Sequence, residues 1–239
     1  LVGSVHVDGL TEKARSELLE AYELYREWLL TSESGGGSFT NWVAISYYFW
    51  HIGDWSRAAD LLSRAMERFK GRSDVSTGDV EKLQFRLMVA DYFLAKEAEG
   101  GRQADKAGEL WNEAGRMADA ILGEKSRYRR NQEACTMGAV IYGGYFIKEG
   151  LQVKWIPALG QWKKAYELWK LLRGRAESGS DDWWNATFYL FYTVIQDRKT
   201  RGQKVVDIRK AFESLKATSP DLGGAKWKPL FEWLDRQIY

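Results

Sequence analysis

Hydrophobic residues recur every three or four positions along most of this 239-residue chain, which is the spacing of amphipathic helices. The pattern is clearest over residues 39–72, where Gly53 and Asp54 separate two apolar stripes. Gly53 can adopt the positive φ that ends a helix, and Asp54 can accept hydrogen bonds from the free N–H groups that open the next one. This stretch therefore predicts two antiparallel helices joined by a tight turn. The stripes are formed by Trp42, Ile45, Ser46 and Phe49, and by Trp55, Ala58, Leu62, Ala65 and Phe69.

The same spacing predicts helices on both sides of this hairpin. Residues 1–9 form a lead-in, and the last helix, at 225–238, has one apolar and one polar face, as a capping helix does. Glycines in the stretch 131–149 favour a close approach to a neighbouring helix, because glycine otherwise destabilises a helix interior. Pro157 excludes a continuous helix beyond that stretch. The remaining helices are expected at 10–31, 80–99, from Ala107 to about Ile121, at 131–149, 161–176 and 183–196, and around Ile208 to Leu215.

The central stretch resembles the tetratricopeptide repeat family, whose pattern is Trp-x2-Leu-Gly-x2-Tyr followed by Ala-x3-Phe in a unit of about 34 residues. Small residues at Ser46, Ala58 and Ala65 would let helix axes approach closely. This chain departs from the pattern with Ser46 for Gly, Leu62 for Phe and Lys70 for the closing Pro. The resemblance implies an all-α fold of stacked antiparallel pairs in a right-handed superhelix. Here the pattern reads Trp42-x2-Ile45-Ser46-x2-Phe49, then Gly53-Asp54-Trp55, then Ala58-x3-Leu62-x2-Ala65.

The other pairs match this pattern more weakly. Their second-helix motifs begin at Ala14, Ala58, Ala107, Ala165 and Ile208, at spacings of 44, 49, 58 and 43 residues. Every spacing exceeds 34, which indicates either insertions between tetratricopeptide units or a HEAT-type array with a unit of about 40–47 residues. We expect residues 1–239 to form a single helical-repeat domain. The motif at Ala14 has no first helix before it, so the first helix is either a cap or part of a longer array.

Composition narrows the classes of partner. The net charge is only +2, from 35 basic and 33 acidic residues, so we expect no nucleic acid as the main partner. No run of 18 apolar residues occurs, so no membrane-spanning helix is expected. The single cysteine, Cys135, is expected to be a buried apolar residue and leaves the compartment open.

Residues with catalytic or metal-binding chemistry are sparse. The two histidines, His6 and His51, lie far apart in the sequence and lack partners at metal-ligand or triad spacing. Adjacent acids at Asp181 and Asp182 precede an apolar helix, which is typical of a helix cap. Basic clusters at 127–130 and 198–204 are typical of solvated loops, although the second could reach an anionic partner. We therefore expect no catalytic site, no metal and no cofactor.

Aromatic residues are abundant, with 12 Trp, 12 Tyr and 10 Phe. In tetratricopeptide proteins the first helix of each pair lines the concave face, and the resemblance implies partner-binding residues there. The pattern leaves the register of the helix at 183–196 open by one residue, and each aromatic residue could instead belong to the core. The residues implied are Thr40, Val43, Tyr47, Trp50 and His51 in the central repeat, and Trp184, Phe188, Phe191 and Tyr192 near the C-terminus.

These observations lead to a functional hypothesis. We expect a non-catalytic protein–protein interaction module or scaffold that binds a peptide or protein segment in an aromatic concave groove, because large flat side chains bury much area at little rotamer cost. Two alternatives remain. One is carbohydrate recognition by the same aromatic residues, for which an exposed coplanar Trp or Tyr pair would be diagnostic. The other is a structural subunit of a larger assembly.

Overall fold

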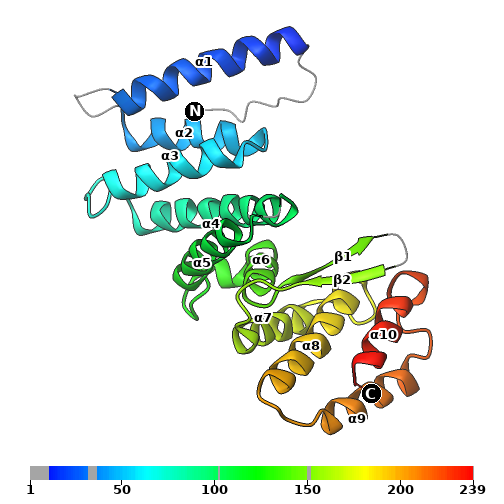
Figure 1. The fold of residues 1–239 in the computed structure, drawn as a ribbon. Helices are drawn as coiled ribbons and strands as arrows, with labels where there is room; N and C mark the ends of the chain where they lie inside the picture. The colour runs from blue at the N-terminus through cyan, green and yellow to red at the C-terminus, as the bar shows by residue number, and fades with distance from the viewer. Residues whose placement is uncertain (1–10, 32–36, 102, 150–151, 239) are drawn as a thin grey trace. The chain divides into compact units, whose positions relative to one another are not determined.

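The computed structural model describes residues 11–31, 37–101, 103–149 and 152–238. The lead-in expected at 1–9 lies outside these residues. The all-α expectation holds for most of the chain, but the described residues also contain one antiparallel β-hairpin (Figure 1). The elements are α1 (Glu12–Thr31), α2 (Phe39–His51), α3 (Trp55–Arg68), α4 (Thr77–Gly100), α5 (Ala104–Ile121), a 3-10 helix η1 (Arg127–Arg130), α6 (Gln132–Gly143), β1 (Tyr145–Glu149), β2 (Gln152–Ile156), α7 (Trp162–Arg175), α8 (Asp181–Thr200), α9 (Val206–Thr218) and α10 (Gly224–Ile238).

The chain divides into two compact units, residues 1–121 and 122–239. The first unit holds α1 to α5, and the second holds η1 to α10 with the hairpin. Each unit has a hydrophobic core of its own. Neighbouring helices pack in sequence order within each unit, which is typical of a helical-repeat arrangement.

The predicted hairpin at 39–72 is confirmed as α2 and α3. Gly53 has a φ of 76°, which a side chain would disfavour, and it ends the first helix. The Asp54 carboxylate accepts a hydrogen bond from the backbone N–H of Arg57 at 3.1 Å, which caps the second helix. Small buried residues at Ser46, Ala58 and Ala65 lie on the two helices, as expected for closely packed axes.

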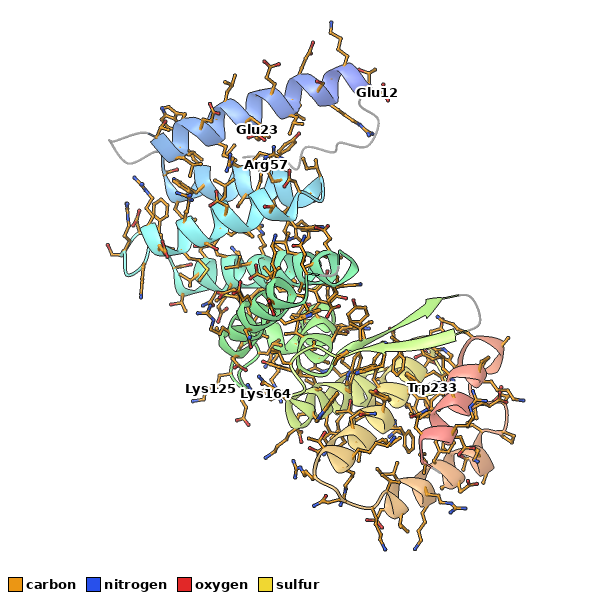
Figure 2. All side chains as sticks on the ribbon, in the orientation of Figure 1. Glu12, Glu23, Arg57, Lys125, Lys164 and Trp233 are labelled. Atoms are coloured by element: carbon orange, nitrogen blue, oxygen red, sulfur yellow. The ribbon has the colours of Figure 1, made fainter. Side chains whose placement is uncertain are left out.

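Helix α1 contacts α3 mainly through charged side chains. Its only buried residue is Leu29. The guanidinium of Arg57 on α3 lies 2.5 Å from the Glu23 carboxylate, and the two side chains point toward each other in Figure 2. Arg26 of α1 lies 3.3 Å from Asp60 of α3. Partly buried apolar residues of α1 also pack on the core, and the Tyr22 ring stacks on Tyr48 of α2 at 3.7 Å between centroids.

Helices α6 and α7 form a close pair because glycines stand where they meet. A Cβ atom on Gly138 would lie 3.1 Å from Cδ1 of Leu168, and one on Gly143 would lie 3.0 Å from Cβ of Ala165. The expectation that glycines in 131–149 permit a close helix contact is therefore confirmed for these two. Gly144 acts differently, because it ends α6 with a φ of 110° and opens the hairpin.

The β-hairpin corrects the expectation of a helix from 131 to 149. Helix α6 stops at Gly143, and strand β1 pairs with β2 so that Tyr145 faces Ile156 and Phe146 faces Trp155. The rings of Phe146 and Trp155 pack against Tyr192 of α8 at 4.8 and 4.1 Å between centroids. Aromatic and β-branched residues favour strands, and this packing selects a strand over a continued helix.

The last three helices close the second unit. The predicted capping helix is α10, whose buried stripe includes Trp227, Phe231 and Leu234. The indole N–H of Trp227 donates to the Asp181 carboxylate at 2.9 Å, and Lys226 lies 2.7 Å from the same group. Ser180, rather than an aspartate, caps α8. Asp181 therefore ties the start of α8 to α10.

Candidate functional site

A large hollow lies in the second unit, between α7, α8 and α9. Its volume is about 670 Å³, which is in the range of ligand-binding clefts. One wall is apolar, and Phe191 on that wall packs edge-on against Phe212 of α9 at 5.4 Å between ring centroids. A large apolar side chain of a partner could bury much of its surface here. The apolar wall is formed by Leu190, Phe191, Val194, Ile208 and Ala211.

Three cationic side chains surround this apolar wall. Arg173 of α7 lies over the Trp183 ring at 4.8 Å, and Lys170 lies 6.0 Å from the Tyr166 ring. A guanidinium N–H of Arg198 donates to the Gln203 amide oxygen at 3.0 Å.

These cations lack acidic partners. Among the described residues, none of Lys170, Arg173 and Arg198 forms an ion pair with a carboxylate. The only acid that lines the hollow is Asp207. The hollow therefore has an apolar wall and a formal charge of +2, from three cations and one carboxylate.

A buried hydroxyl also lines this hollow. Thr187 of α8 is fully buried, and its Oγ1 has no hydrogen-bond partner among the described residues. Thr193 and Thr200 on the same helix donate to the carbonyls of Tyr189 and Gln196, four residues earlier. Leaving a buried hydroxyl unpaired costs about 1–3 kcal/mol, so this group is unusual in a wall that is otherwise apolar.

A second hollow of about 380 Å³ adjoins the first and shares Tyr166, Val194 and Arg198 with it. It extends the surface along α7 and α8 as far as Lys163 and Arg201. Arg201 is not free, because it lies 2.9 Å from the Asp197 carboxylate. We call the two hollows together the α7–α9 groove.

The α7–α9 groove differs from the sequence expectation in two ways. The second helices α7 and α9 line it along with α8, whereas the resemblance implied first helices alone. Of the four residues expected on α8, only Phe191 lines it. The other three, Trp184, Phe188 and Tyr192, are between 1% and 6% exposed and belong to the core around α10. They are therefore corrected to core positions.

The register of α8 accounts for this correction. Trp183 and Thr187 line the groove, each one residue before a residue that was expected there. Both stripes of α8 are largely apolar, so periodicity alone does not distinguish the core side from the groove side. The signal that could have separated them is the cationic face of α7, where Lys163, Lys170 and Arg173 recur at helical spacing.

The residues expected on α2 lie in the first unit and share one face of that helix. Thr40 and Val43 line a separate hollow of about 380 Å³ with residues from the start of α4. Tyr47 lies one turn further, and the Arg86 guanidinium lies over its ring at 4.4 Å. The acids of this hollow are already engaged, since Asp74 pairs with Arg72 and Asp79 with Lys82.

Trp50 and His51 complete this face of α2. The Tyr47 and Trp50 rings are nearly parallel, at 6.0 Å and 13°, and His51 packs edge-on against Tyr47 at 4.1 Å. Trp50 is half-buried against Trp55 of α3, and its indole nitrogen is buried without a partner among the described residues. The structure thus brings the five α2 residues together, with Trp50 contributing partly to packing.

Two other ionisable side chains, those of Cys135 and Asp91, are buried. Burial raises the pKa of the Cys135 thiol, which disfavours the nucleophilic thiolate, and its Sγ lies 3.2 Å from the Arg129 carbonyl. Burial also raises the pKa of Asp91 on α4 to about 7, against the weaker opposing effect of Arg116. Within the described residues, no group of three His, Cys, Asp or Glu side chains is arranged to hold a metal ion.

Two further findings bear on the class of protein. Across the described part of the chain, no helix combines the length and the apolar character needed to cross a membrane. Comparisons with protein-family models, curated proteins and solved structures found no match for this chain, so the tetratricopeptide resemblance stays a prediction.

Proposed function

We propose that this protein is a non-catalytic interaction module that binds a peptide or protein segment in the α7–α9 groove. The observation that carries the proposal is the large hollow of about 670 Å³ with an apolar, partly aromatic wall. Binding sites of this kind bury an apolar anchor and use a few polar groups to fix its orientation. The tetratricopeptide-like helical pairs favour the same class of function.

Two features of the groove support the recognition of a chain segment. The adjoining hollows extend along α7 and α8, so the surface is longer than one compact ligand requires. The apolar wall is also held firmly, because Phe191 packs against Phe212 and Ile208 is buried. A preformed wall lowers the entropic cost of binding.

Peptide panning with a matched blocked variant tests the proposal. Ala211 lines the hollow and is exposed, so Ala211→Trp should fill the groove without disturbing the core. We expect a random peptide library to yield sequences that bind the wild type and are lost on Ala211→Trp, with helical circular dichroism unchanged. If every enriched peptide binds both proteins equally, the groove is not the binding site.

Carbohydrate recognition is the second candidate, and one observation favours it. The Tyr25 and Trp28 rings of α1 are stacked and nearly parallel rather than coplanar, at 12° and 5.3 Å between centroids, and Trp28 is 47% exposed. An exposed flat ring of this kind can stack on a sugar. A glycan array probed with the wild type and with Trp28→Ala tests this candidate, and identical binding by both proteins would exclude Trp28 as the sugar platform.

A further inference from the structure

The charges of the α7–α9 groove identify the chemistry of its occupant more closely. We infer that the groove binds an acidic peptide segment that carries one large apolar side chain, with the apolar side chain in the hollow and carboxylates on the surrounding cations. This inference rests on the proposed function. It assigns a partner class by charge complementarity, and the cations concerned lie mainly on α7.

The cationic face of α7 is the first observation. Lys163, Lys170 and Arg173 are exposed and lie on the side of α7 that lines the groove. Ten residues of helix separate the first from the last, which is about 15 Å along the axis. Five residues of extended peptide span about the same length. This row therefore matches several carboxylates along a chain better than a single anionic head group.

The availability of these cations is the second observation. Elsewhere in the second unit, lysines pair with acids, as Lys216 does with Asp235 at 3.2 Å and Lys226 with Asp181 at 2.7 Å. Lys170, Arg173 and Arg198 have no such partner among the described residues. Arg173 is also held in place by the Trp183 ring. A planar guanidinium that is already oriented suits a carboxylate better than a flexible one.

The buried Thr187 hydroxyl is the third observation. It belongs to the lining of the hollow but is covered by neighbouring atoms, and its Oγ1 has no partner of its own among the described residues. A polar atom of a bound side chain, such as the indole N–H of Trp or the hydroxyl of Tyr, would pair with it by displacing the covering atoms. The groove would then recognise a tryptophan or tyrosine anchor flanked by aspartate or glutamate.

Fluorescence polarisation with designed peptides tests the inference. The probe is a labelled peptide of about eight residues with one central Trp between glutamates. Its matched partners replace the glutamates by glutamines or the Trp by serine. We expect the acidic Trp peptide to bind at least about tenfold more tightly than either partner, and its affinity to fall as salt is raised.

Protein variants locate this binding on the groove. Lys170→Gln with Arg198→Gln should weaken the acidic peptide about tenfold and leave the glutamine peptide nearly unchanged, since each exposed charge contact contributes a few-fold. Lys210→Gln with Lys228→Gln removes the same charge from exposed positions outside the groove, so binding should persist. Thr187→Val should weaken the Trp peptide more than a matched Leu peptide.

The outcomes separate this inference from the proposed function. Equal binding of the acidic and glutamine peptides, lost on Ala211→Trp, would overturn the acidic preference and leave the groove as a peptide site. Equal weakening by the two double variants would attribute the effect to net charge and would also overturn the inference. Failure of every designed peptide to bind would overturn it as well, while the panning experiment decides the proposed function independently.

Discussion

Asp91 offers the most specific test of the structure of the first unit, because its carboxyl group lies in the core of that unit. Its side chain is 3% exposed, and its Oδ2 has no hydrogen-bond partner in the described residues. Burial raises its pKa from the ordinary 3.8 to about 7. At about pH 5 the group is therefore neutral in the folded protein and charged in the unfolded chain, and folding stability is lost as the pH rises toward 7.

The size of this loss follows from the two pKa values. Each unit of pKa difference corresponds to about 1.4 kcal/mol, so the free energy of unfolding should fall by about 2.5 kcal/mol between about pH 5 and about pH 8. Above the folded pKa both states are charged, and the decline ends. Asp91→Asn keeps the shape and removes the titration, so the variant should gain about that much relative to the wild type over this range.

Urea unfolding followed by far-UV circular dichroism across this pH range measures the difference. Glu109→Gln on α5 is the matched control, because Glu109 is exposed and its replacement should leave the pH dependence of the wild type intact. Comparison with Asp91→Asn also cancels the pH-dependent contributions of all other groups, because the two proteins share them. Parallel stability curves for the wild type and Asp91→Asn would refute the assignment of a neutral buried carboxyl group.

Four further substitutions test stability. Gly144→Ala should lower the free energy of unfolding by about 3 kcal/mol, because φ is 110° and the new Cβ would lie 2.3 Å from the Ile156 carbonyl oxygen. Gly108 lies in open space on α5, so Gly108→Ala should instead stabilise the protein by about 0.5–1 kcal/mol. Thermal melts compare the two variants. Equal effects would contradict the assigned role of Gly144. Thr187→Val should stabilise the second unit by about 1 kcal/mol in urea unfolding, and a loss would mean that the hydroxyl is paired. Phe49→Ala should lower the free energy of unfolding of the first unit by about 3–5 kcal/mol, because Phe49 is fully buried. A urea midpoint equal to that of the wild type would contradict its place in the core.

Local chemistry made the helices of this protein predictable. The turn at Gly53 and Asp54 needs only a positive φ and a capping carboxylate. Glycine and aspartate are residue types that supply these two features, so the sequence predicts the turn directly. The stripe of α10 likewise divides apolar from charged residues at helical spacing. Strand β1 lies in the stretch 131–149 that was expected to be helical, because its apolar residues fit either a helix or a strand. The strand is favoured because the rings of Phe146 and Trp155 pack against the ring of Tyr192 on α8.

The candidate site shows the same division between local and long-range causes. The hydrophobic pattern showed that α8 is apolar on more than one side, but the cationic face of α7 was not used to orient it. That pattern did not determine which stripe of α8 is buried, because Trp184 and Trp183 are equally apolar and only the packing of α10 against the former distinguishes them. The groove also brings together residues 45 positions apart, such as Tyr166 and Ala211. Periodicity describes each helix alone, whereas the position of a hollow depends on how three helices pack together, which the pattern of one helix does not contain.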